Sequence, residues 1–128
     1  MSDKHVVLTE NAPPTLPGIY SQAIVANGFV YCSSCVPMDA QTGKIVDRDI
    51  KMHTHQCIKN ISNILEVAGS NITKAAKFNV FLFNMDDFVA TNSVCTLYWG
   101  NVKPSQTCAA VKTLPLNVDV EIEYLAIL

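Results

Sequence analysis

Arginine is almost absent from this sequence, and its lysines are not clustered. Arg48 is the single arginine, and the nine basic residues are scattered among eleven acidic ones, which leaves a net charge of −2. Surfaces that bind DNA or RNA need grouped lysine and arginine side chains, because neutralising phosphate charge supplies much of the affinity. We therefore expect no nucleic-acid partner.

Long apolar runs and internal linkers are also missing. No stretch approaches the roughly 18 uninterrupted apolar residues of a membrane helix, and the opening MSDKHVVLTE lacks the apolar centre of a secretory signal. We therefore expect no membrane association. No Pro-, Gly- or Ser-rich linker or repeat divides the chain, and 49% of it is hydrophobic. A single domain over residues 1–128 is predicted.

Cysteine is present in an odd number, five, which favours free thiols in a reducing compartment, and we expect a cytoplasmic protein. Cys32 and Cys35 have the C-x-x-C spacing of redox dithiols and of half a zinc site. On a regular strand their Cα atoms would lie about 10 Å apart on opposite faces, too far for a disulfide. A zinc site needs a second close pair, and Cys57, Cys95 and Cys108 are isolated. We favour partly buried strand residues over redox or metal use, and expect no metal and no cofactor.

Two helices are predicted. Apolar residues three and four apart over 50–68 indicate a helix of roughly five turns, which Asp47 or Asp49 can cap and Gly69 can end. A second helix is expected from about residue 85 to residue 99.

Strands account for the other regular segments. Asn27-Gly28 between two apolar runs is typical of a two-residue β-hairpin. Further strands are expected at 6–8, 74–83, 107–113 and 118–128. The order β-β-α-β-α-β-β, with the short first strand as an addition, predicts an α+β fold with one sheet and two helices on one face.

The face of the sheet away from the helices needs a cover. The segments VFLF (80–83) and YLAIL (124–128) carry apolar side chains at successive positions, so both faces of these strands are apolar. Two helices cover one face only. We therefore expect a homo-oligomer, in which further copies of the chain bury the other face.

Two groups of ionisable residues stand out. His53 and His55 point in different directions on a helix and cannot share a metal, so a solvated helix face beside a core Cys57 is favoured. Asp119 and its neighbours Glu121 and Glu123 fall on one face of a strand. A solvated face is the ordinary interpretation, and the alternative is that one of them enters a cleft between subunits as a general acid or base.

Five segments in order resemble blocks of the Rid/YjgF family, whose founding activity is hydrolysis of reactive enamines and imines. The resemblance extends from about residue 11 to the end. The segments are NAPPTLPGIYSQAI, CSSCVPMDAQTG, CIKNISNILEVAGS, NVFLFNMDDFVATNSV and KPSQTCAAVKTLPLNVDVEIEYLA. The resemblance implies a chorismate-mutase-like domain that assembles as a homotrimer, with small-molecule ligands in the clefts between subunits.

The same resemblance implies site residues. Glu121 corresponds to the glutamate that positions or activates the attacking water in the family. The substrate-binding positions that the resemblance implies are Tyr20, Ser33, Asn92, Gln106 and Cys108.

Two positions depart from the family pattern. Gln106 stands where the family pattern has an arginine that binds the substrate carboxylate, a loss expected to cost at least about one to two orders of magnitude in affinity for 2-imino acids. Lys103 and Lys112 are possible substitutes, whereas Arg48 lies near the first helix. Ser34, with the cysteine that follows it, replaces a Gly-Gln pair and narrows the approach to a ligand.

Three functions are compatible with these residues. The first is a deaminase of the 2-iminobutanoate/2-iminopropanoate type with an altered substrate range. The second is a non-catalytic trimer that binds a small metabolite or a protein partner in the same clefts. A ribonuclease, a label often given to this family, is disfavoured by the near-neutral charge.

Overall fold

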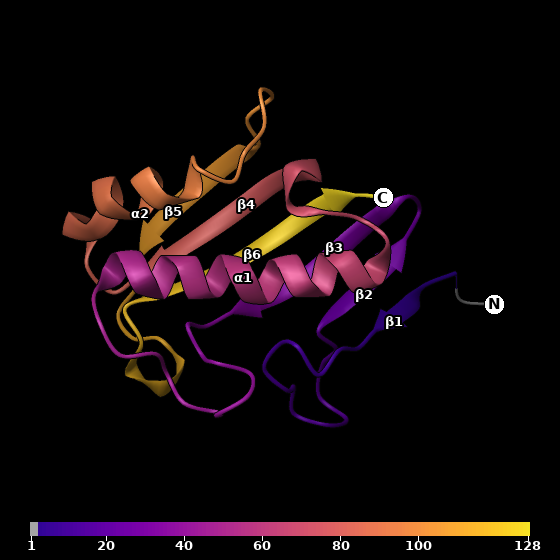
Figure 1. Ribbon diagram of the computed structural model, residues 1–128, viewed down its shortest axis with the longest axis horizontal. Coiled ribbons are helices and arrows are strands. Elements are labelled where there is room, and N and C mark those ends of the chain that lie inside the picture. Colours follow the sequence, from indigo (N-terminus) through magenta and orange to yellow (C-terminus); the bar gives the residue numbers. More distant parts are fainter. Residues whose placement is uncertain (1–2) are drawn as a thin grey trace.

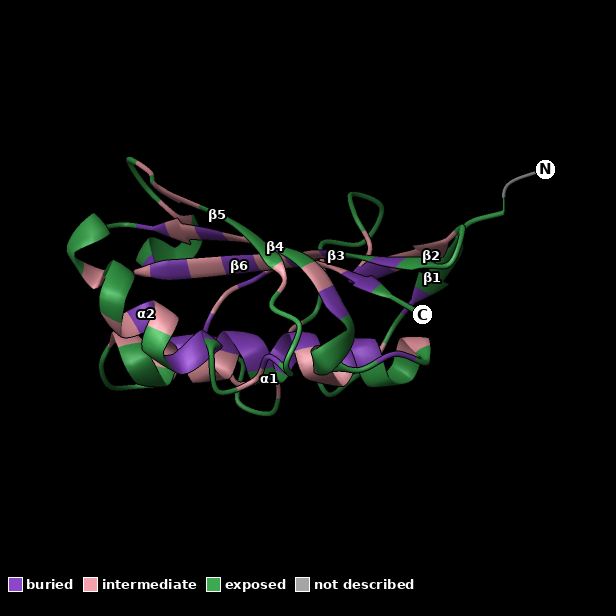
Figure 2. Ribbon diagram, turned by 90° about the horizontal axis from the view of Figure 1, so that it is seen from above, coloured by how far each residue is buried: buried purple, intermediate pink, exposed green. Residues whose placement is uncertain are grey.

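A six-stranded mixed sheet carries both α-helices on the same face in the computed structural model, which describes residues 3–128 (Figures 1 and 2). The strand order is β1-β2-β3-β6-β4-β5, and only the pair β4–β5 is parallel. The strands are β1 (His5–Val7), β2 (Ala23–Ala26), β3 (Phe29–Cys35), β4 (Ala75–Leu82), β5 (Ser105–Ala110) and β6 (Val120–Ile127). The helical segments are α1 (Ile50–Ala68), η1 (Ile72–Lys74), η2 (Met85–Asp87), α2 (Phe88–Cys95) and η3 (Pro115–Asn117). The predicted α+β class, with both helices on one face, is confirmed.

The hairpin between β2 and β3 forms where the sequence predicted it. Asn27 and Gly28 have positive φ angles of 52° and 81°, and Ala26 pairs directly with Phe29 across the turn. Two successive positive φ angles give the type I′ turn, whose twist matches that of the two strands.

Helix α1 also begins and ends as predicted. The Asp49 side chain accepts a hydrogen bond from the Met52 amide at 3.1 Å, and Gly69 ends the helix in the left-handed conformation at φ 92°. Asp49, and not Asp47, is therefore the cap. The apolar stripe is buried on the sheet, and each fully buried aliphatic side chain contributes about 1.5–3 kcal/mol. Its fully buried members are Cys57, Ile58, Ile61, Ile64 and Leu65.

The second helix is shorter than the sequence predicted. The 3₁₀ turn η2 leads into α2, which ends at residue 95 and not near residue 99. The chain turns there because Trp99 packs into the core, with its ring centre 4.6 Å from that of Phe78 and 5.7 Å from that of Tyr124. A straight continuation of the helix was the wrong expectation, since this aromatic contact bends the chain back towards the sheet.

A β-bulge separates Cys32 from Cys35. Cys32 pairs with Tyr124 and Cys35 with Ile122, so three steps along β3 match two along β6. Both cysteines consequently face the helices and are buried, and the prediction that they lie on opposite faces is wrong. Both are free thiols; burial raises the pKa of Cys32 to about 12 and that of Cys35 further. Neither sulfur has the low pKa of a reactive dithiol.

The sheet face opposite the helices is rich in partly exposed apolar side chains. Tyr31 is 48% exposed and Ile127 49% exposed, and Phe29, Phe81 and Leu125 share this face. Figure 2 shows both helices below the sheet and only loops above it. The chain therefore presents an uncovered apolar surface, as its sequence indicated. None of the helices within residues 3–128 has the length and apolar character of a membrane span.

Candidate functional site

A hollow of about 660 Å³ lies where the end of β3 and the first residues of β6 meet two loops. One loop is the proline-rich segment before β2, and the other contains η3. The polar side chains that line the hollow are Thr15, Tyr20, Gln22, Ser33, Ser34, Glu121 and Glu123. The structure thus places three of the predicted site residues, Tyr20, Ser33 and Glu121, around one cavity.

Of the two carboxyl groups in this hollow, Glu121 is the one whose pKa is clearly shifted by its environment. Partial burial raises its pKa above the ordinary value of 4.5, the charge of Glu123 raises it further, and the Ser34 hydroxyl opposes the shift. A carboxyl group with a raised pKa holds and releases a proton more readily near neutral pH, as a general acid or base must. Glu121 therefore lies in a hollow of the chain and not on a fully solvated face.

The β-bulge in β3 places two serine side chains along the hollow. Ser33 and Ser34 are the two residues between the buried cysteines, and both line the cavity. The Ser33 hydroxyl donates a 2.6 Å hydrogen bond to the Ser21 carbonyl, which leaves its oxygen free to accept. Two neighbouring serines face one cavity because the bulge interrupts strand alternation.

Gln22 fixes the proline-rich loop through hydrogen bonds to its backbone. The sequence analysis did not identify this residue. Its side chain is 3% exposed; its Oε1 accepts from the Thr9 amide at 2.7 Å, and its Nε2 donates to the Thr9 and Pro13 carbonyls at 3.0 Å. A buried amide that satisfies three backbone groups fixes the loop that carries Tyr20. One glutamine directly before a short apolar strand has no pattern that would have revealed this role.

The other three predicted substrate-binding residues form a separate group near the edge strand β5. Gln106 and Cys108 lie on β5 opposite Phe78 and Val80 of β4, and so project towards the helices. The Gln106 Nε2 donates a 2.8 Å hydrogen bond to the Oδ1 of Asn92 on α2. None of these three lines the hollow that contains Glu121. Within one chain the predicted site is therefore divided into two groups.

The basic residues do not enter the hollow. The Lys103 ammonium donates to the Gly100 carbonyl at 3.0 Å, and Lys112 is exposed beyond the end of β5. Arg48 is exposed in the loop before α1, at a positive φ of 121°. Within the described residues, no lysine, arginine or histidine contributes to the lining.

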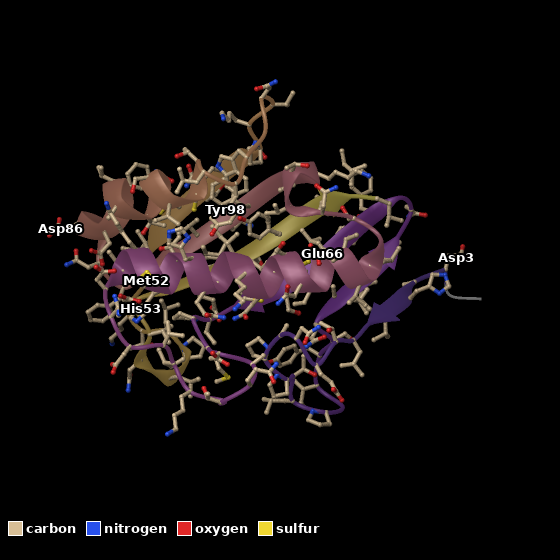
Figure 3. The ribbon with its side chains drawn as sticks, in the orientation of Figure 1. Asp3, Met52, His53, Glu66, Asp86 and Tyr98 are labelled. Carbon is tan, nitrogen blue, oxygen red and sulfur yellow. The ribbon has the colours of Figure 1, made fainter. Side chains whose placement is uncertain are left out.

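The histidines are held by hydrogen bonds and are not a solvated helix face, which corrects the sequence prediction. His53 contacts the Asp119 carboxylate at 2.7 Å through Nδ1 and donates to the Val46 carbonyl at 2.8 Å through Nε2. His55 Nδ1 lies 2.6 Å from the Tyr98 hydroxyl. Figure 3 shows His53 at the beginning of α1 and Tyr98 alongside that helix. Since Asp119 precedes β6 and turns to α1, it does not share the face of the two glutamates.

No metal centre is formed by the part of the chain that the structure describes. Across residues 3–128, no three histidine, cysteine or acidic side chains converge as metal ligands would.

We predict that Glu121→Gln stabilises the fold near neutral pH. Because the folded-state pKa of Glu121 is raised, the stability that its proton provides is lost as the pH rises through that value. A neutral amide keeps this contribution, so the melting temperature of Glu121→Gln should exceed that of the wild type near neutral pH and match it in acid. The matched control is Glu123→Gln, which weakens a 2.6 Å bond from Asn79 Nδ2 and should lower the melting temperature. A less stable Glu121→Gln protein at neutral pH would contradict the assignment.

Comparison with known proteins places these features in a family. The family model described as endoribonuclease L-PSP matches residues 9–128. The mitochondrial protein mmf1 of Schizosaccharomyces pombe is 43% identical over 113 residues, covering 86% of this chain and 68% of that protein.

Two further relatives span nearly the whole chain. The 2-iminobutanoate/2-iminopropanoate deaminase of Dermatophagoides farinae is 31% identical over 128 residues, 100% of this chain and 99% of that one. The crystal structure of the Rid-family protein YyfA from Yersinia pestis superposes with a TM-score of 0.93 at 36% identity, covering 98% of this chain and 99% of the other. The chain therefore belongs to the endoribonuclease L-PSP family, the Rid/YjgF proteins.

Proposed function

We propose that this protein is a homotrimer that hydrolyses small reactive imines to a carbonyl compound and ammonia, in clefts between its subunits. The observation that carries the proposal is Glu121, a half-buried carboxyl group with a raised pKa in a hollow of about 660 Å³. Membership of a family that includes an imine deaminase supports the reaction class. A cytoplasmic location stays a prediction, and the printed name of the fission-yeast relative assigns that protein to mitochondria.

The chemistry needs one group that moves protons. Glu121 accepts a proton from water as the water oxygen bonds to the imine carbon, and passes it to the nitrogen. It then transfers the remaining hydroxyl proton to the nitrogen as the carbon–nitrogen bond breaks and the carbonyl forms. The raised pKa suits both steps, because the same carboxyl group must take up and release a proton near neutral pH. Ser33, Ser34 and Tyr20 line the same hollow and supply neutral hydrogen-bonding groups around the reacting atoms.

Assembly explains why the predicted site is divided. Asn92, Gln106 and Cys108 lie near one edge of the sheet, and the Glu121 hollow opens elsewhere. A neighbouring subunit would bring its amide pair to this chain's hollow and would cover the apolar sheet face. The Glu121 hollow and the amide pair of the neighbouring subunit would then form one cleft. In that cleft a neutral amide would occupy the position of the family's arginine.

A second candidate is a non-catalytic trimer that binds a metabolite or a protein in the same clefts. The hydrogen bond from Gln106 to Asn92 favours it, since this amide is already engaged and offers no charged grip to a 2-imino acid. Ribonuclease activity stays disfavoured, because the net charge is −2 and the hollow presents two carboxylates.

Ammonia release is the direct test of the reaction. Wild-type protein mixed with freshly generated small imines, with and without a carboxylate, should release ammonia above the spontaneous rate. Glu121→Gln should lower this acceleration by about 10²–10⁴-fold, the range for loss of a general acid–base group. Glu123→Gln is the comparison within the same hollow and should lower the acceleration much less, because it removes only a smaller contribution to the raised pKa of Glu121. No acceleration with any imine, together with ligand-induced thermal stabilisation, would replace this proposal with the binding candidate.

The amide at position 106 is expected to limit hydrolysis of 2-imino acids. Gln106→Arg introduces two charge-assisted donors for a carboxylate and should raise kcat/KM for 2-iminobutanoate by about ten- to hundred-fold. Gln106→Met breaks the bond to Asn92 without adding charge and should give no such gain. A folded Gln106→Arg protein without improved hydrolysis would show that this residue does not face the substrate.

The oligomeric state is predicted from the uncovered sheet face. Light scattering should give three times the 14.0 kDa mass of one chain. Leu125→Asp places a charge among the apolar side chains of the open face and should dissociate the trimer. Val67→Asp changes a 55% exposed valine on α1, on the other side of the molecule, and should leave the mass unchanged. A wild-type monomer would contradict the predicted assembly.

A further inference from the structure

The hollow has negative charge and no positive charge. Glu121 and Glu123 both line it, and no lysine, arginine or histidine among the described residues does. One Glu123 oxygen accepts a 2.6 Å bond from Asn79, so Glu121 is the carboxylate left to face a ligand. A cavity lined by carboxylates attracts cations and repels anions, and partial burial strengthens both effects because it reduces screening by solvent.

The residues that a neighbouring subunit would add do not reverse this charge. Asn92 and Gln106 are neutral and already bonded to each other. The closest lysine in sequence to this pair, Lys103, is tied to the carbonyl of Gly100. A ligand carboxylate in the cleft would therefore meet two acidic side chains and no positively charged partner.

An apolar wall faces the two acids. It is formed by residues from the proline-rich loop, the η3 turn and the loop after β3, which include Pro13, Leu16, Met38 and Leu116. Leu116 is 63% exposed and has a positive φ of 58°, a conformation that residues with a Cβ rarely adopt. An exposed leucine that lines the cavity in this conformation offers an apolar contact to a bound ligand.

We infer that the hollow selects small aliphatic imines that carry the positive charge of a protonated nitrogen and no carboxylate, the class formed by oxidation of primary amines. This inference rests on the proposed imine hydrolysis and names its substrate class. In the reaction R–CH=NH₂⁺ + H₂O → R–CHO + NH₄⁺, the water oxygen bonds to the carbon and the carbon–nitrogen bond breaks. Glu121 carries the two water protons in turn to the nitrogen, the second as the hydroxyl group of the addition product becomes the carbonyl, so no oxidant or reductant is required. The aldehyde and ammonium are the products, and an amine-oxidising enzyme supplies the substrate.

Binding of three stable probes of similar shape tests the selectivity without turnover. The probes are butylammonium, butan-1-ol and butanoate, titrated calorimetrically into the full-length protein. Butylammonium should bind at least about ten-fold more tightly than butanoate, with butan-1-ol between them. Glu121→Gln should reduce the difference between the charged probes. Equal or tighter binding of butanoate to the wild type would overturn the inference.

Two side-chain variants locate the selectivity. Asparagine tolerates the positive φ at position 116 but removes the apolar side chain. Leu116→Asn should therefore weaken butylammonium binding several-fold, while butylammonium still binds more tightly than butanoate. Leu97→Asn is the control, because Leu97 is also highly exposed but lies beyond the end of α2. Unchanged binding in Leu116→Asn would remove this residue from the site. If the wild type binds butanoate tightly and Lys112→Ala abolishes this binding, a lysine reaches the cleft. That result would overturn the inferred selectivity for cations.

The failure of this inference differs from the failure of the proposed function. If no imine is hydrolysed but butylammonium binds preferentially, the hollow selects cations and the catalytic proposal fails. If imines are hydrolysed but those bearing a carboxylate react faster, the catalytic proposal stands and the selectivity is wrong. The deciding measurement is the ratio of kcat/KM for the imine of butylamine to that for 2-iminobutanoate, expected to exceed about ten.

Discussion

The unequal pairing of β3 with β6 shapes both the core and the cavity of this protein. Between Cys32 and Cys35 the strand contains one more residue than its partner, and the extra residue turns both cysteines to the helices. The same irregularity leaves Ser33 and Ser34 beside the Glu121 hollow. A regular strand would expose one of the two cysteines and bury one of the two serines. The core would then lose one buried side chain, and the hollow would lose one hydroxyl group.

Local signals in the sequence predicted the elements of the fold well. Each of these signals depends on the backbone preferences of a few neighbouring residues, which the sequence shows directly. They are the Asn27-Gly28 turn and the two ends of α1 at Asp49 and Gly69. The bulge and the early end of α2 depend instead on contacts between distant segments, such as that of Trp99 with Phe78. No periodicity reports such contacts, and these two predictions were accordingly wrong.

The candidate site was predictable to a similar extent. Resemblance to the family identified Tyr20, Ser33 and Glu121, which the structure places around one hollow. It could not reveal that Asn92 and its partner Gln106 lie away from that hollow, because motifs in a linear sequence do not show which segments the fold brings together. The buried Gln22, which orders the proline-rich loop, carries no sequence signature at all.

The unequal burial of the five thiols has a practical consequence. Cys32, Cys35, Cys57 and Cys95 are buried, whereas Cys108 is partly accessible on the edge strand β5; burial raises the pKa of all five thiols. A thiol-directed dye therefore meets a single target in the native molecule and four more only when the helices separate from the sheet. The chain carries its own reporter of local opening, with no engineered label.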